Sequence, residues 1–254
     1  MYNLILASFI LLITNMSYSD TKSSVTLAAD DWCPFTCDPK SPTPAKGVLF
    51  DIATAALSES KIEIKYEFIN WARATALMKK QKIDGLIGVY ASDFPELLLT
   101  KNPLMISQDC FYSKSESSDL KNWQWNGLKS LDGLKVGIIN GYGYGEIVDN
   151  FKLTPAGKQI FFESSGDNPL TQNIKKIEKN RIQLILENKM VIDYLKSQNK
   201  QLKLTQHGCL EDKKIYIGFI NTPKNIEIIK KIDLFMASPQ SEAKIKSILQ
   251  KYLK

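Results

Sequence analysis

The chain has 254 residues, of which 44% are hydrophobic and 24% are charged. This composition can build a buried core, so it excludes a chain that is disordered throughout. The formal net charge of +6 comes almost entirely from scattered lysines, and the only arginines are Arg73 and Arg181. Nucleic-acid readout relies on arginine forks and clustered basic faces, so the charge pattern argues against a nucleic-acid-binding protein and favours a solvated lysine surface.

The first 19 residues form a candidate export signal. They are almost uncharged, and the apolar run 4–13 is followed by the small residues Ser17 and Ser19. This order predicts a signal peptide over residues 1–19, cleaved near Ser19, and a mature protein in the periplasm. The segment before the apolar run has no lysine or arginine, so an uncleaved anchor stays open as an alternative. No other apolar run approaches the roughly 18 residues needed to span a bilayer.

Four cysteines agree with an oxidising compartment, because an even number in an exported chain favours disulfides. Sequence alone permits three connectivities. Cys33 and Cys37 are the natural local pair, which leaves Cys110 with Cys209 and closes a loop of about a hundred residues. A zinc site is disfavoured because the chain has one histidine and no paired CxxC spacing, so we predict neither a metal nor a cofactor.

The first half of the chain alternates strand and helix patterns. A buried strand over 25–29 runs into an aromatic, proline-containing loop over 30–37. A helix with one apolar face follows over 49–57, then an alternating strand over 62–68. Asn70 can cap the next helix, over 71–78, and a buried strand over 83–89 closes the series.

A second series begins with a strand over 134–139. Glycines 141, 143 and 145 then make a turn into a short helix, where backbone amides can converge on a polar ligand. The later elements are predicted, in order, as a strand over 159–163, a helix over 170–177, a strand over 182–186, a helix over 189–197 and a strand over 202–205.

The last predicted elements are a strand over 215–220 and helices over 225–236 and 241–253. They are too few to build a third lobe, so the economical arrangement returns them to the first. The chain would then cross between the lobes twice, near 110–114 and 208–215, with Cys110 and Cys209 side by side at the hinge.

One pattern occurs twice. The segment 79–87, KKQKIDGLI, reappears in degraded form over 178–186 as EKNRIQLIL. In both copies a helix ends in a basic polar turn and an apolar run short enough to be a buried strand follows. The repeat predicts two similar lobes with a cleft between them, which is the usual place for a ligand.

The order of several short motifs is similar to that of a known family. They are Trp32-Cys33-Pro34-Phe35, Gly47 with Asp51, Trp71, Lys82-Ile83-Asp84, the segment LDGLKVG over 131–137, and the terminal Lys251-Tyr252. In this order they resemble the extracytoplasmic solute-binding proteins of family 3, the polar amino acid transport type, over roughly residues 25–254.

The resemblance implies an α/β, two-lobed type II periplasmic binding protein fold with two hinge crossovers. Lobe 1 would comprise residues 20–112 plus 216–254, and lobe 2 residues 113–215. It implies a monomeric protein without catalytic activity that captures a small polar ligand, amino acid-like or a related organic ion, and delivers it to an ABC transporter permease.

In that family an arginine after the fourth strand of the first lobe binds the ligand carboxylate, and an aspartate after the corresponding strand of the second lobe binds the amine. The aligned positions hold Glu96 and Asn188 in this chain. A carboxylate at Glu96 would repel a ligand carboxylate, and Asn188 lacks the charge to neutralise an ammonium group. We therefore do not expect a simple zwitterionic α-amino acid as the ligand.

Aromatic and basic residues provide the sharpest site candidates. Trp32 and Phe35 can form an aromatic wall of the cleft, or can simply pack around the small disulfide ring, and Trp71 can line the cleft or the core. Arg73 offers a fork that binds carboxylate or phosphate better than lysine does. A salt bridge on the surface of the lobe is the alternative for Arg73.

Loop residues complete the predicted ligand site. They follow strands or glycine-rich turns, and helix capping or ordinary loop structure explains several of them equally well. These candidates are Tyr90, Ala91, Ser92, Gly141, Tyr142, Gly143 and Ser164.

Two rival functions remain. An enzyme on the same scaffold, dehydratase-like, would need an acid or base in the cleft, and Glu96 and Glu187 are the places to look. A sensory protein that binds a ligand without feeding a transporter is the other. The sequence does not identify the ligand.

Overall fold

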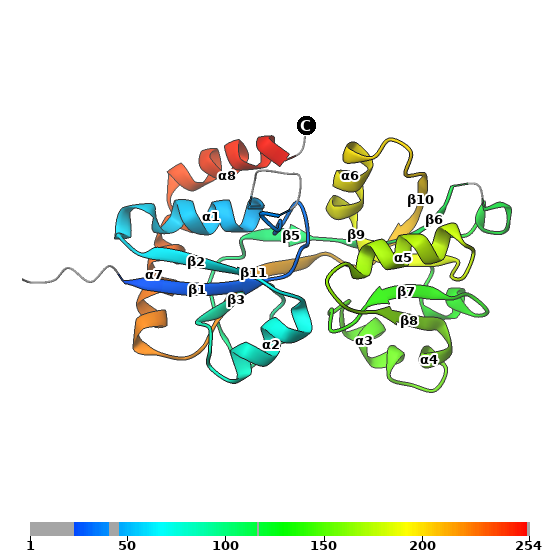
Figure 1. The fold of residues 1–254 in the computed structure, drawn as a ribbon, viewed down its shortest axis with the longest axis horizontal. Coiled ribbons are helices and arrows are strands. Elements are labelled where there is room, and N and C mark those ends of the chain that lie inside the picture. Colours follow the sequence, from blue (N-terminus) through cyan, green and yellow to red (C-terminus); the bar gives the residue numbers. More distant parts are fainter. Residues whose placement is uncertain (1–22, 41–45, 116, 253–254) are drawn as a thin grey trace, which may run out of the picture.

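The computed structural model describes residues 23–40, 46–115 and 117–252, arranged as two α/β lobes (Figure 1). The predicted signal peptide, residues 1–19, lies outside the described residues. Within the described ranges, no helix combines the length and apolar character needed to cross a membrane. Each lobe has its own β-sheet with helices packed against it, so the predicted α/β class and two-lobed architecture are confirmed.

The sheet of lobe 1 is mostly built from the first series of elements. Strand β1 runs parallel to β2 and β3, as expected for strands joined by helices. The returning strand β11 pairs antiparallel with β3, β4 and β5. These strands are β1 (Ser24–Ala29), β2 (Glu63–Phe68), β3 (Gly85–Val89), β4 (Leu98–Leu99), β5 (Met105–Ser107) and β11 (Lys213–Phe219).

The helices of lobe 1 include the C-terminal end of the described chain. Helix α1 packs against α7 and α8, which return from lobe 2. The backbone N–H of Gly47 donates to the Tyr252 hydroxyl at 3.0 Å, and that hydroxyl donates to Asp51 at 3.1 Å. Gly47, Asp51 and Tyr252, which all belong to the motifs of the family resemblance, therefore meet where α8 packs against α1. The helices are α1 (Val48–Leu57), α2 (Trp71–Lys79), α7 (Pro223–Met236) and α8 (Pro239–Tyr252), with a 3-10 turn over Ser58–Ser60.

The sheet of lobe 2 has the strand order β10, β6, β9, β7, β8. Its strands are β6 (Asp109–Lys114), β7 (Val136–Ile139), β8 (Phe161–Ser164), β9 (Leu184–Asn188) and β10 (Leu204–Cys209). Its helices are α3 (Glu146–Lys152), α4 (Gly157–Ile160), α5 (Pro169–Glu178) and α6 (Lys189–Gln198), with 3-10 turns over Ser118–Leu120 and Leu128–Leu131.

The strand predicted over 159–163 begins two residues late. The short helix α4 occupies the residues just before it, so β8 begins at Phe161. The Thr154 hydroxyl accepts a hydrogen bond from the Gly157 N–H of this helix at 3.0 Å.

The sequence repeat has the same conformation in both lobes. Gln81 after α2 and Asn180 after α5 both adopt the left-handed region, at φ 53° and 54°. Asp84 then accepts a hydrogen bond from the Thr26 N–H of the neighbouring strand at 2.8 Å. Gln183 accepts the equivalent bond from the Lys135 N–H at 2.9 Å. The two copies thus end a helix and fix the next strand to its parallel neighbour in the same way.

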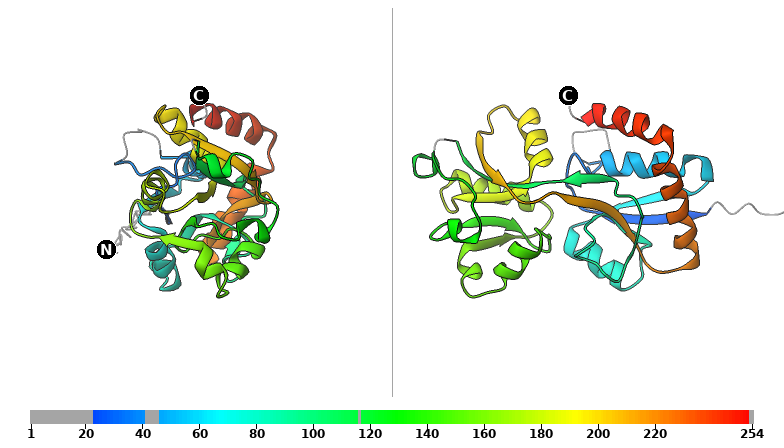
Figure 2. Two further views of the ribbon diagram at one scale, coloured as in Figure 1. Left: turned by 90° about the vertical axis from the view of Figure 1, so that its right-hand side faces the viewer. Right: turned by 180° about the vertical axis from the view of Figure 1, so that it is seen from behind.

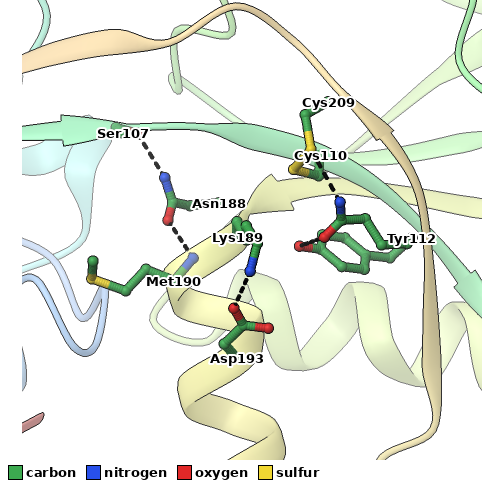
Figure 3. Close-up of a disulfide and its surroundings, with 9 residues drawn as sticks. Ser107, Cys110, Tyr112, Asn188, Lys189, Met190, Asp193 and Cys209 are labelled. Atoms are coloured by element: carbon green, nitrogen blue, oxygen red, sulfur yellow. Dashed lines mark hydrogen bonds and ion pairs between the residues drawn. A yellow bond between two sulfur atoms is a disulfide. The ribbon is translucent and has the colours of Figure 1, made fainter. Parts of the chain in front are cut away.

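Two chain segments connect the lobes and run side by side (Figure 2). One passes from β5 into β6 and the other from β10 into β11, and each pairs with the other on both sides of the boundary. A disulfide joins Cys110 to Cys209 where the segments enter lobe 2 (Figure 3). The second predicted disulfide, Cys33 to Cys37, is also present.

Candidate ligand-binding cleft

The carboxyl ends of strands from both lobes meet at the lobe boundary. Residues 30–37 follow β1, Tyr90 follows β3, residues 140–145 follow β7, and Glu187 and Asn188 end β9. In α/β sheets, ligands bind outside these strand ends. The loops therefore form the two walls of a cleft.

The loop over residues 30–37 is a tightly bonded turn. Trp32 and Thr36 exchange backbone hydrogen bonds of 2.7 and 3.2 Å, and the Cys33–Cys37 disulfide closes the same turn around a cis Cys33–Pro34 bond. The Phe35 ring stacks on Trp32 with centroids 4.3 Å apart. The turn fixes the indole of Trp32 at the cleft while Phe35 supports it from the core.

A cavity of about 30 Å³ lies between the lobes. Space of this size holds a water molecule or two, so the lobes must separate or side chains must rotate before a larger molecule can enter. Its lining is aromatic and acidic and, among the described residues, contains no lysine or arginine. The lining residues are Asp30, Trp32, Thr36, Trp71, Ile87, Gly88, Tyr90 and Asp93 of lobe 1 and Tyr142 and Gly143 of lobe 2.

Tyr142 crosses the cleft from the glycine-rich loop of lobe 2. Its hydroxyl donates to Asp30 Oδ2 of lobe 1 at 2.5 Å. Its ring makes edge contacts with Trp32 and Trp71, at centroid distances of 6.3 and 6.4 Å. Burial raises the pKa of Asp30 to about 6, although the hydrogen bond from Tyr142 acts in the opposite direction.

Glu187 is the most deeply buried carboxyl group at the cleft. It is 2% exposed, and Oε1 accepts hydrogen bonds from the Trp32 indole N–H at 3.3 Å and the Asn188 N–H at 2.8 Å. Oε2 has no hydrogen-bond partner. Burial, with smaller contributions from the charges of Asp109 and Asp30, raises the pKa of Glu187 to about 8.

Lys213 lies close to residues that line the cavity and is already paired within the protein. Its Nζ lies 2.6 Å from Asp109 Oδ2, donates to the Gly143 carbonyl at 2.6 Å, and sits 3.8 Å from the centre of the Tyr90 ring. Lys213 thus connects the hinge strand β11 to the loops of both lobes.

Asn188 makes its side-chain hydrogen bonds at the hinge between the lobes and at the start of α6. Its Nδ2 donates to Ser107 Oγ at 2.6 Å, and its Oδ1 accepts from the Met190 N–H at 2.9 Å, which caps α6 (Figure 3). Ser107 is also 2.9 Å from the Tyr90 hydroxyl. The amide of Asn188 therefore already has a donor partner and an acceptor partner within the protein.

Other predicted site residues lie away from the cavity lining. Arg73 is exposed on α2, and exposed Glu96 borders a separate surface pocket of lobe 1. Buried Ser164 donates to Asn173 at 2.6 Å inside lobe 2. Ala91 is exposed, whereas Ser92 and Gly141 line an outer pocket of about 590 Å³ that shares Asp93, Tyr142 and Gly143 with the cavity.

The sequence prediction missed Asp30, Asp93 and Lys213. Asp30 follows β1 directly and Asp93 lies three residues beyond Tyr90, so both occupy the strand ends where ligands bind. That position was the available signal for the two aspartates. Lys213 could not be found in this way because it is one of many lysines.

Solved structures with the same fold are known, although no family model and no curated protein matches the chain. A histidine kinase sensor domain with similarity to periplasmic binding proteins has 12% identity, with 91% of this chain and 97% of that chain covered at TM-score 0.74. A periplasmic binding protein of Salmonella typhimurium with high arginine specificity has 13% identity, with 91% and 100% covered at TM-score 0.68.

A third similar structure is the substrate-binding protein of an ABC uptake transporter from Streptococcus pneumoniae with bound histidine. It has 18% identity, with 90% of this chain and 92% of that chain covered at TM-score 0.70. At these identities the similarity concerns the fold. The chain has the two-lobed fold of the periplasmic amino-acid-binding proteins.

Proposed function

We propose that the protein is a non-enzymatic receptor of the periplasm that captures a small organic cation between its lobes. The observation that carries this proposal is the cavity lining, which combines Asp30 and Asp93 with aromatic rings and, among the described residues, has no basic side chain. Aromatic faces and carboxylates attract a cation by the ring quadrupole and by charge. Closure of the lobes would then remove the cation from water.

The arrangement disfavours a ligand that carries a free carboxylate. Lys213 already pairs with Asp109 and with the Gly143 carbonyl, and Arg73 is exposed outside the cavity lining. Asp30 and Asp93 both line the cavity and would repel an anionic group there. A monocarboxylate, or a zwitterion with one amine, is therefore expected to bind weakly.

Ligand binding in this fold works through closure, because only the closed form presents both walls to the ligand. Admission requires Tyr142 to leave Asp30 or the lobes to separate, since the cavity is only about 30 Å³. A bound cation would replace the phenol as the partner of Asp30.

The proposed ligand would be delivered to an ABC transporter permease, as the similarity to a transporter substrate-binding protein suggests. A sensory role is the second candidate, because a histidine kinase sensor domain has the same fold at TM-score 0.74. Uptake of the labelled ligand by cells with and without the gene separates the two. Loss of uptake supports transport, and unchanged uptake with an altered response to the ligand supports sensing.

A thermal-shift screen followed by calorimetry tests the ligand class, because a ligand that binds the folded state raises its melting temperature. We expect alkylamines, guanidines and quaternary ammonium compounds to stabilise the protein, and monocarboxylates and simple zwitterionic amino acids not to. Asp30→Asn should lower the cation affinity about tenfold, whereas Asp132→Asn, an exposed carboxylate on lobe 2, should not.

Arg73→Gln separates the structural proposal from the sequence-based expectation of an arginine fork. An organic cation held at Asp30 should bind this variant as tightly as the wild type. Stabilisation by carboxylates or zwitterions alone, lost in Arg73→Gln, would contradict the proposed ligand class.

A further inference from the structure

A second cavity lies beside the first, on the other side of Trp32 and Tyr142. Its volume is about 100 Å³, and Trp32 and Tyr142 line both cavities. Much of its lining is apolar and comes from lobe 2. The residues that matter here are Ile139, Leu170, Ile174, Val191 and Leu195, together with Glu187.

Glu187 gives this apolar cavity one polar group that lacks a partner. Oε1 is engaged by Trp32 and by the backbone of Asn188, whereas Oε2 is buried with no hydrogen bond. A buried polar atom without a partner costs about 1–3 kcal/mol, and more when the group is charged. Glu187 lines this cavity, and a donor group on a ligand would remove that cost once neighbouring side chains move to uncover Oε2.

Tyr142, which lines both cavities, belongs to a glycine-rich loop. Tyr142 stands between Gly141 and Gly143 in the loop after β7, and Gly141 has φ 81°, a conformation that glycine adopts without strain. A rotation of Tyr142 away from Asp30 would open space between the two cavities, because its side chain lines both. The resulting site would have Asp30 in the first cavity and Glu187 in the second, with hydrocarbon side chains beside them. Asp31, Asp167, Asn168 and Thr171 also line the second cavity.

We infer that the joined site takes an elongated dication, in which two nitrogen cations are connected by a hydrocarbon spacer. One ammonium group pairs with Asp30 among the aromatic rings, and the other pairs with Glu187 Oε2. The spacer lies against the apolar wall of the second cavity. This inference rests on the proposed function and specifies its ligand, because each buried carboxylate then has its own cationic partner.

The test compares a series of α,ω-diaminoalkanes, from diaminopropane to diaminohexane, with n-alkylamines of equal carbon number. Calorimetry on the wild type should give one preferred diamine length, bound about tenfold more tightly than the matching monoamine. In Glu187→Gln this ratio should fall to about one, with the monoamine affinity retained. Glu178→Gln, which neutralises an exposed carboxylate on α5, is the matched control and should keep the wild-type ratio.

A second variant covers the case in which Glu187→Gln does not fold. Thr171 is exposed and borders the second cavity, so Thr171→Trp should block it with little effect on the core. This variant should also lose the preference for the diamine while it retains monoamine binding.

Two failures are distinguishable. Equal affinities for diamines and monoamines in the wild type, or an unchanged affinity ratio in both variants, would contradict the inference that the ligand is an elongated dication. The proposed function as a receptor for an organic cation would not be affected by that result. The absence of binding by any amine, with binding of carboxylates or zwitterions instead, would overturn the proposed function and this inference with it.

Discussion

The hydroxyl of Tyr142 in lobe 2 donates a 2.5 Å hydrogen bond to Asp30 in lobe 1. The two residues follow the carboxyl ends of β7 and β1, so their bond joins equivalent corners of the two sheets across the cleft. The Trp32–Glu187 hydrogen bond and the contact of Lys213 with Gly143 lie beside it. Closure of the cleft can therefore be tested one contact at a time.

Tyr142→Phe should shift the protein toward an open form. The change keeps the ring between Trp32 and Trp71 and leaves Asp30 Oδ2 without its partner, at a cost of about 1–3 kcal/mol in the closed state. Small-angle scattering should record a larger radius of gyration than for the wild type.

Tyr66→Phe is the matched control for this change. Its hydroxyl contacts Thr54 and the Phe50 carbonyl within lobe 1, so its loss should lower stability without changing the radius of gyration. Equal radii for the wild type and Tyr142→Phe would show that the hydrogen bond does not hold the lobes together.

Stability should fall as the pH rises above the acidic range. Glu187 has a folded-state pKa of about 8 against an ordinary value of 4.5, so the folded protein binds more protons than the unfolded chain in this window. The free energy of unfolding then decreases from about pH 4.5 to about pH 8, and Asp30, with a pKa raised from 3.8 to about 6, adds to the lower part.

Urea unfolding at several pH values measures this decrease. Glu187→Gln has no titrating group at this position, so its unfolding free energy should change less between about pH 6 and pH 8 than that of the wild type. Parallel pH profiles for the two proteins would rule out Glu187 as the source.

Lys213→Met should be strongly destabilising. It removes the partner of Asp109, which is 4% exposed, and a buried unpaired charge costs about 3–5 kcal/mol. The double variant Lys213→Met/Asp109→Asn should recover much of the loss in urea unfolding. Lys189→Met removes an exposed pair with Asp193 and should cost less than about 1 kcal/mol. No recovery in the double variant would mean that Lys213 acts mainly through Tyr90 and Gly143.

Gly143→Ala should hinder closure by steric contact between the lobes. A Cβ at this position would overlap the Asp93 carboxylate, so either that side chain rotates away or the lobes separate. We expect weaker cation binding and a larger radius of gyration. Asp93→Ala in the same chain removes the clash and should restore the radius of gyration of the Asp93→Ala single variant. A double variant as open as Gly143→Ala alone would locate the obstruction elsewhere.

The repeat made the two-lobed fold predictable, because both copies act locally in the same way. Gln81 and Asn180 follow the end of a helix, and Asp84 and Gln183 then bond the next strand to its neighbour. The cysteines were equally informative, since one local pair left one long-range pair. Trp32, Trp71, Tyr90, Tyr142 and Gly143 were predicted from strand and helix ends and do line the cavity.

Side-chain direction and long-range pairing were harder to predict. Arg73 is two residues from Trp71, and residues at this spacing do not share a helix face, so the arginine is exposed while the tryptophan lines the cavity. Trp32 and Glu187 are 155 residues apart and belong to different lobes. A local sequence pattern cannot predict a contact between residues so far apart in the chain.

The Cys110–Cys209 disulfide makes the second lobe a covalently closed ring, because the residues between these cysteines include strands β7 to β9 and all four lobe 2 helices. A protease cut at any bond inside the ring would leave the chain in one piece until the disulfide was reduced. Bending is also confined to the short segments between the disulfide and lobe 1.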